Sequence, residues 1–113
     1  MPKLDLPPGW LRIVRELLAT HVPDAVVWAC GSRVSGGSHP GSDLDLALHH
    51  PGDLRAEHSG RHRLLDALHE SDLPILVEVH DWARLPESFH REIERTHLVV
   101  QEPALAGAGP TRS

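Results

Sequence analysis

Four residues between positions 31 and 46 have the types and spacing to hold phosphate and metal together. Gly31 and Ser32 follow the apolar run VVWAC, and Asp43 and Asp45 come after ten intervening residues. A glycine after a strand lets backbone N–H groups approach an anion, and a serine adds a hydroxyl where a helix starts. In a strand, residues two apart share one face and lie about 7 Å apart. The two carboxylates can therefore hold hard divalent cations such as Mg²⁺ or Mn²⁺.

Each half of this stretch has a plain structural alternative. A Gly-Ser pair is also typical of an ordinary turn, and an Asp-x-Asp pair at a strand start is also typical of solvated carboxylates. Both halves occur together here, between two apolar strands, and their combination favours a phosphate and metal site.

The stretch GSRVSGGSHPGSDLDL resembles the signature of the minimal nucleotidyltransferases of the DNA polymerase β-like superfamily, which is Gly-Ser, ten residues, then Asp-x-Asp. Arg33 and Gly36 fit the GSRxxG form of that signature, and residues 71–101 are similar to the C-terminal half of the family. The resemblance covers residues 9–102. One departure is Glu78, because the family places a third aspartate on the corresponding core strand.

The resemblance implies transfer of a nucleoside monophosphate, AMP from ATP, to a hydroxyl of an acceptor such as a side chain of a partner protein. It implies Mg²⁺ or Mn²⁺ as cofactor and a helical HEPN-type protein as partner, in a toxin–antitoxin pair or a two-subunit transferase. The catalytic and metal-binding residues would be Asp43, Asp45 and Glu78, with Glu78 as ligand of the acceptor-side ion and proton acceptor. The nucleotide-binding residues would be Gly31, Ser32, Arg33 and Ser42.

A second hypothesis belongs to another functional class. The chain could be an interaction subunit of a two-protein complex that binds nucleotide but transfers it weakly, with Glu78 as a sign of lost activity. Magnesium-dependent turnover with a cognate partner separates the two hypotheses.

Length and composition predict one compact domain. The chain has 113 residues, of which 40% are hydrophobic and only 4% aromatic, which indicates an aliphatic core. We expect an N-terminal lead at 1–8, the nucleotidyltransferase-like domain at 9–102 and a disordered tail at 103–113. The single cysteine, Cys30, lies in an apolar run and is interpreted as a small core residue.

The charge balance and hydropathy exclude two classes of partner. A formal net charge of −5 argues against extended contact with a nucleic-acid backbone, which is held mainly by Lys and Arg. A nucleoside triphosphate remains compatible because it arrives with its own cations. No apolar run approaches the length of a membrane span and no signal peptide is evident, so we expect a cytoplasmic protein.

Periodicity predicts helices alternating with strands, hence an α/β fold, or α+β with a mixed sheet. Core strands are expected at 25–30, 43–48 and 75–82, with a short final strand at 97–101; the first of them should be covered on both faces. Helices are expected from Trp10 to Pro23, over 57–70, and from Pro86 onward with Leu85, Phe89 and Ile93 pointing inward. The glycine-rich segment 33–42 should begin as a short helix and continue as a mobile loop. The resemblance implies the small polymerase β-like palm.

Strand parity places Glu78 and His80 on one face of the third strand and Val77 and Val79 on the other. By pattern alone, Glu78 suits an edge position in water as well as a metal site, because a buried carboxylate needs a partner. His80 is interpreted as a partly buried structural histidine.

The remaining basic side chains are interpreted as surface residues. The spacing of the histidines matches no zinc motif, and no cysteines cluster with them. The histidines concerned are His49, His50, His58 and His62. The arginines expected on a solvated face are Arg55, Arg61 and Arg63.

Overall fold

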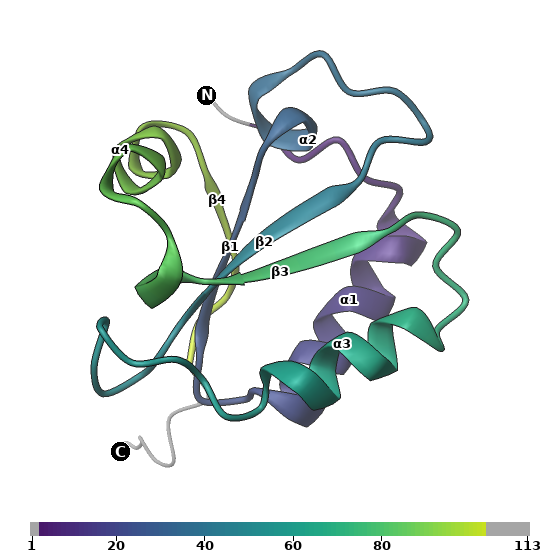
Figure 1. Cartoon of the computed structure of the whole chain (residues 1–113). Coiled ribbons are helices and arrows are strands. Elements are labelled where there is room, and N and C mark those ends of the chain that lie inside the picture. Colours follow the sequence, from purple (N-terminus) through teal and green to yellow (C-terminus); the bar gives the residue numbers. More distant parts are fainter. Residues whose placement is uncertain (1–2, 104–113) are drawn as a thin grey trace, which may run out of the picture.

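A four-stranded mixed sheet forms the centre of the fold. The computed structural model describes residues 3–103. The elements are α1 (Pro8–His21), β1 (Val26–Cys30), α2 (Ser32–Ser35), β2 (Leu44–His49), α3 (Arg61–His69), β3 (Val77–Asp81), the 3-10 helix η1 (Trp82–Arg84), α4 (Glu87–Arg95) and β4 (Leu98–Gln101) (Figure 1). The strand order is β3-β2-β1-β4; β1 is antiparallel to β2 and β4, and β2 is parallel to β3. The predicted α/β fold with a mixed sheet and a short edge strand is confirmed.

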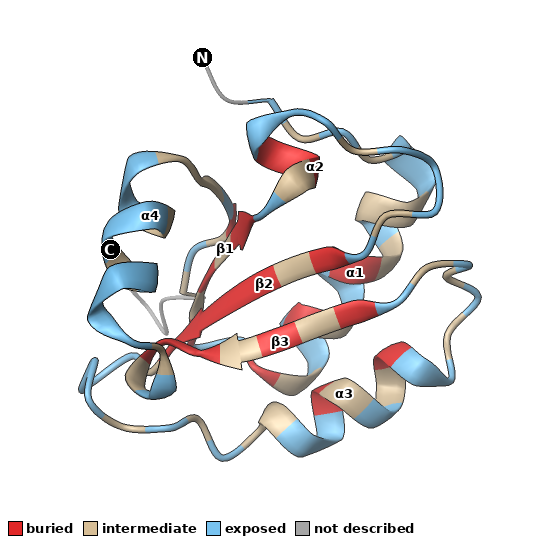
Figure 2. Cartoon of the chain, turned by 45° about the horizontal axis from the view of Figure 1, so that its top comes forward, coloured by how far each residue is buried: buried red, intermediate tan, exposed pale blue. Residues whose placement is uncertain are grey.

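The hydrophobic core lies between one face of the sheet and the helices α1 and α3, which run side by side (Figure 1). Alternation along β2 directs Leu44, Leu46 and Leu48 to this face, and all three are buried. The same alternation gives β3 its bands of buried and half-buried residues (Figure 2). The other core residues include Val14 and Leu18 of α1, Val27 and Ala29 of β1, Leu64 and Leu68 of α3, and Val77 and Val79 of β3.

The opposite face of the sheet carries polar and aromatic side chains. Trp28 of β1, Asp45 of β2, and Glu78 and His80 of β3 alternate with the core residues and are only half-buried. Helices α1 and α3 do not cover this side. The prediction that the first strand is covered on both faces therefore holds only in part, because on this side Cys30 is buried whereas Val26 and Trp28 are half-buried.

Two predicted elements are shorter than the sequence indicates. The helix expected over 57–70 starts at Arg61, because the backbone N–H of His58 donates to Asp81 Oδ1 at 3.1 Å and His58 Nδ1 accepts from Gly60 N at 2.9 Å. These bonds hold the preceding residues in a turn. The strand expected over 75–82 spans Val77–Asp81, and the chain turns into η1 at Trp82.

Arg61 is not a solvated residue, contrary to the prediction. Its Nε donates to the backbone oxygen of Val79 at 2.8 Å and lies 3.8 Å from Asp81 Oδ2. Arg61 therefore joins α3 to β3, whereas Arg55 and Arg63 are exposed as predicted.

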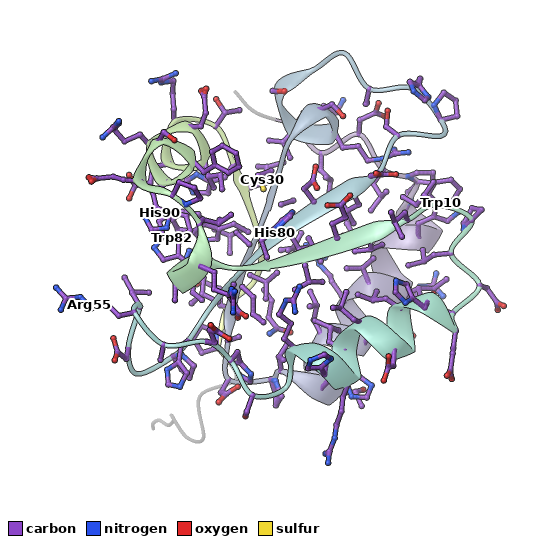
Figure 3. All side chains as sticks on the ribbon, viewed as in Figure 1. Trp10, Cys30, Arg55, His80, Trp82 and His90 are labelled. Atoms are coloured by element: carbon purple, nitrogen blue, oxygen red, sulfur yellow. The ribbon has the colours of Figure 1, made fainter. Side chains whose placement is uncertain are left out.

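Stacked rings hold α4 over the open face of the sheet. No residue of α4 is buried, but His90 of α4 stacks on Trp82 with ring centroids 3.9 Å apart (Figure 3). His97, just after α4, stacks on Trp28 at 3.9 Å. His49 lies 4.4 Å from Trp28 and 4.6 Å from Trp82, measured between ring centroids. This aromatic cluster positions a helix that lacks a buried apolar stripe of its own.

The prediction of surface histidines is wrong at two positions. His49 is 4% exposed, with Nδ1 3.1 Å from the Val26 oxygen and Nε2 without a hydrogen-bond partner among the described residues, and burial lowers the pKa of its imidazole. The His58 side chain is 9% exposed and its Nε2 lies 2.8 Å from Asp24 Oδ1; that hydrogen bond lowers the pKa of Asp24. His50 is half-buried and His62 is exposed.

Both ends of the chain bear on the predicted domain limits. Asp5 N donates to the Arg33 oxygen at 2.7 Å, so the N-terminal lead is attached to α2. Most of the predicted tail, 104–113, lies outside the described residues. Among residues 3–103, no helix has both the length and the apolar character needed to cross a bilayer.

Candidate active site

A cleft of about 560 Å³ lies on the open face of the sheet. Its floor is formed by the end of β1, the start of α2 and the polar side of β2 and β3. The floor residues include Gly31, Ser32, Asp45, Glu78 and His80. Four predicted site residues, Gly31 and Ser32 of the turn and Asp45 and Glu78 of the strands, therefore converge on one cleft.

Gly31 creates the space in which the Asp45 carboxylate sits. Its backbone has φ +81° and ψ −161°, a region that is essentially restricted to glycine. A Cβ added at Gly31 would lie 2.5 Å from Asp45 Oδ2, far inside van der Waals contact. The glycine is thus required twice, for the turn out of β1 and for the close approach of the carboxylate.

Sheet register brings Asp45, Glu78 and His80 together. Asp45 and Glu78 are direct partners across the parallel β2–β3 pair, and His80 lies one same-face position further along β3. His80 Nε2 lies 3.5 Å from Asp45 Oδ1 and 3.7 Å from Glu78 Oε1, and one ligand atom from each of the three residues falls within 4.8 Å of the others. The predicted strand parity of Glu78 and His80 matches this arrangement.

The carboxylates of this group shift the pKa values of His80 and of the nearby Cys30. The hydrogen bond to Asp45 raises the pKa of His80, with the charges of Asp45 and Glu78 acting in the same direction and burial opposing it. Burial, assisted by the charge of Asp45, raises the pKa of the Cys30 thiol to about 11. Cys30 lies at the cleft end of β1 (Figure 3), remains a thiol at neutral pH, and behaves as the small buried residue that the sequence predicts.

Asp43 and Ser42 lie apart from this group. Asp43 is exposed and precedes the first residue of β2 by one position. Ser42 Oγ accepts from His39 N at 2.9 Å, which places its hydroxyl inside the loop. Both residues belong to the described part of the chain, and neither lines the cleft.

Arg33 supports the loop instead of facing the cleft. It is 2% exposed, and its guanidinium donates to the backbone oxygens of Asp5, His39, Pro40 and Ser42 at distances from 2.6 to 3.3 Å. A buried arginine requires such partners, because an unpaired charge is costly away from water. The loop expected to be mobile is thus wrapped around Arg33. The sequence predicts that Arg33 contacts phosphate, but its guanidinium donates to these backbone oxygens instead.

One wall of the cleft is apolar and comes from the segment around α4. Leu85, Phe89 and Ile93 line it, and Phe89 is 55% exposed. The sequence correctly groups these three residues on one side of the segment, although Leu85 precedes α4 and only Phe89 and Ile93 belong to the helix. The inward orientation expected for them is wrong, because that side borders the cleft and not the core.

Two features of the site escape sequence reasoning. His80 belongs to the carboxylate group, and the only sequence signal for this is its parity with Glu78. The apolar wall depends on the aromatic cluster that seats α4, and single histidines scattered along the chain give no sign of stacking partners.

Comparison with known proteins shows the class of protein to which this fold and cleft belong. The sequence profile described as "Nucleotidyltransferase domain" matches residues 11–101. The chain therefore belongs to the nucleotidyltransferase domain family.

One curated protein and two crystal structures are similar to this chain. The "Probable protein adenylyltransferase MntA" of Haemophilus influenzae is 42% identical over 111 residues, covering 96% of this chain and 94% of the relative. Two crystal structures share the fold. One is a toxin–antitoxin with AMP-PNP, with a TM-score of 0.65 and 20% identity; the other is a toxin–antitoxin MntA-HpeT mutant, with a TM-score of 0.64 and 18% identity. Each alignment covers 83% of this chain and 74% of the other.

Proposed function

We propose that this protein transfers AMP from ATP to a hydroxyl group on a partner protein, using divalent metal ions. The observation that carries the proposal is the convergence of the Gly31–Ser32 turn with Asp45 and Glu78 on the floor of one cleft. Membership of the nucleotidyltransferase family supports the reaction class. The 42% identical relative, named a probable protein adenylyltransferase, supports AMP as the group and a protein as the acceptor.

The residues on the cleft floor fit a divalent ion. Asp45 and Glu78 offer carboxylate oxygens, the donors that Mg²⁺ and Mn²⁺ prefer. The absence of a side chain at Gly31 leaves room beside Asp45 Oδ2 that a Cβ would fill. Asp43 is assigned to the same site by the family signature, and its exposed position at the start of β2 leaves its side chain free to turn toward bound nucleotide.

Each residue then has a role in the transfer. Ser32 and the turn amides would bind the β and γ phosphates of ATP, and Asp43, Asp45 and Glu78 would hold the ions. Bound divalent ions lower the pKa of the attacking hydroxyl and stabilise the leaving oxygen. Glu78 accepts the proton as the acceptor oxygen bonds to the α phosphorus, the bond from that phosphorus to the bridging oxygen breaks, and pyrophosphate leaves.

The nucleotide-binding contribution of Gly31 is the space that it leaves beside Asp45, whereas Arg33 and Ser42 act through the loop. Arg33 binds the carbonyl of Ser42, the residue directly before Asp43. The loop therefore positions the first carboxylate of the signature indirectly, by fixing the backbone that leads into β2.

The proposed acceptor is a helical HEPN-type protein that forms a toxin–antitoxin pair with this chain. The related fold occurs in crystal structures described as toxin–antitoxin complexes, one of them with AMP-PNP.

Variants at Glu78 test the proposal. With ATP, Mg²⁺ and a purified partner, Glu78→Gln should lower AMP transfer sharply while nucleotide binding survives. Glu92→Gln is the matched control, because Glu92 is an exposed carboxylate of the same cleft that pairs with Arg95. Glu78→Asp should also lower the rate if the glutamate is a tuned ligand, whereas a gain would favour a weakened enzyme. Equal, measurable transfer by the parent and both Glu78 variants would remove Glu78 from the site.

A further inference from the structure

His80 lies where a ligand to the proposed ion would lie. Its Nε2 is 3.5 Å from Asp45 Oδ1 and 3.7 Å from Glu78 Oε1. Ligand atoms about 2.1 Å from one octahedral ion are roughly 3 Å apart when adjacent and roughly 4 Å apart when opposite. The two separations from His80 fall between these limits, and one ligand atom from each of the three residues lies within 4.8 Å of the others. His80 is therefore at ligand distance from both carboxylates.

The backbone supports this set of three more strongly than the set suggested by the family signature. Asp45, Glu78 and His80 all come from paired strands and share one face of the sheet. Asp43 precedes β2, is exposed, and does not belong to the group whose ligand atoms lie within 4.8 Å of one another. Within the described residues, the imidazole of His80 completes this group.

We propose that His80 is a nitrogen ligand of the metal ion held by Asp45 and Glu78, and that it makes this site prefer Mn²⁺ to Mg²⁺. The inference rests on the proposed function, because that function requires an ion at these carboxylates. Mg²⁺ favours all-oxygen surroundings and dehydrates reluctantly, whereas imidazole is a better ligand for first-row transition ions. A set of two carboxylates and one imidazole therefore shifts selectivity away from Mg²⁺.

Pulsed electron paramagnetic resonance of Mn²⁺ tests the ligand directly. An imidazole bound to Mn²⁺ produces a nitrogen hyperfine coupling, and protein carrying histidine labelled with the heavier stable nitrogen isotope distinguishes that nitrogen from those of the adenine base. We expect an isotope-sensitive coupling in the parent protein with Mn²⁺ and AMP-PNP. The coupling should disappear in His80→Ala. The affinity for Mn²⁺ should fall roughly tenfold or more, because even the loss of a residue that supports a metal ligand has an effect of that size.

His62→Ala is the matched control. His62 is an exposed histidine of α3 that borders the neighbouring polar cavity together with His80 but lies outside the group of three ligand atoms. The coupling should remain in this variant. The proposal would be overturned if the nitrogen coupling remained in His80→Ala, or if the parent bound Mn²⁺ without any coupling to a histidine nitrogen. Either result would leave the proposed function intact. Failure of the parent to bind Mn²⁺ with AMP-PNP would instead contradict the proposed function itself.

Discussion

Replacing Gly31 by alanine tests the link between backbone conformation and the site. The added Cβ would lie 2.5 Å from Asp45 Oδ2, so the carboxylate must rotate away from the cleft floor. Gly36→Ala is the matched control. Gly36 has φ +102° and ψ 165°, in the same glycine-restricted region, but a Cβ there meets no atom within 4 Å. The two variants therefore share the backbone strain and differ in the contact with Asp45.

The expected magnitudes separate the two effects. A residue other than glycine in this conformation costs about 1–3 kcal/mol, so both variants should lose roughly 4–12 °C in melting temperature without ligand. A ligand at a hundred times its dissociation constant stabilises the native state by about 2.7 kcal/mol, which corresponds to roughly 10 °C for a domain of this size. The parent and Gly36→Ala should show that increase with Mn²⁺ and AMP-PNP, and Gly31→Ala should lose most of it.

Differential scanning fluorimetry with and without Mn²⁺ and AMP-PNP measures both quantities. If Gly31→Ala keeps the full ligand-induced increase, the Asp45 carboxylate does not need the space beside Gly31 and the site assignment fails. If only Gly31→Ala is destabilised without ligand, the conformation assigned to Gly36 is wrong.

Three further predictions concern the residues around the site. Arg33→Lys should lower the free energy of unfolding by about 2–3 kcal/mol in urea titrations, because an ammonium cannot satisfy four separate carbonyls; unchanged stability with weakened AMP-PNP binding would instead make Arg33 a phosphate ligand. Phe89→Ser should change the free energy of unfolding by less than about 0.5 kcal/mol yet lower the rate of AMP transfer. Val99→Ser, at a 44% exposed position of β4 outside the cleft, should leave transfer at the parental rate. Equal transfer rates for the two variants would show that the apolar wall has no role in transfer. Burial lowers the pKa of His49 in the folded state, so folding favours the neutral imidazole, and the free energy of unfolding should fall as pH drops below about 6.5. His49→Phe should reduce this dependence of stability on pH. An unchanged slope in the variant would contradict the argument that burial shifts the pKa of His49.

Local pattern was sufficient to predict the strands of the sheet and the turn at Gly31 and Ser32. The apolar run before Gly31 and the alternation around Asp45 each depend on neighbours in sequence, and strand parity correctly placed Glu78 and His80 on one face. Parity alone did not predict that Glu78 pairs with Asp45; the family resemblance suggested that grouping. These predictions succeeded because side-chain direction in a strand repeats every two residues.

Contacts between distant segments could not be predicted in the same way. Arg33 reads as a cation next to a phosphate turn, but its partners are carbonyls of Asp5 and of the following loop. His49 reads as a residue beside a turn, but two tryptophans from other strands and turns bury it. The aromatic cluster also explains why the apolar face of α4 borders the cleft, since stacking holds the helix without burying that face.

Transfer of label from ATP to the partner tests the central claim most directly. The chain should be purified with the protein encoded by the neighbouring reading frame and incubated with Mg²⁺ or Mn²⁺ and ATP labelled either at the α or at the γ phosphate. The account predicts that α label becomes attached to a hydroxyl side chain of the partner, that γ label leaves as pyrophosphate, and that Asp45→Asn abolishes attachment. Attachment of γ label, or nucleotide binding without any attachment of α label to the partner, would contradict the account.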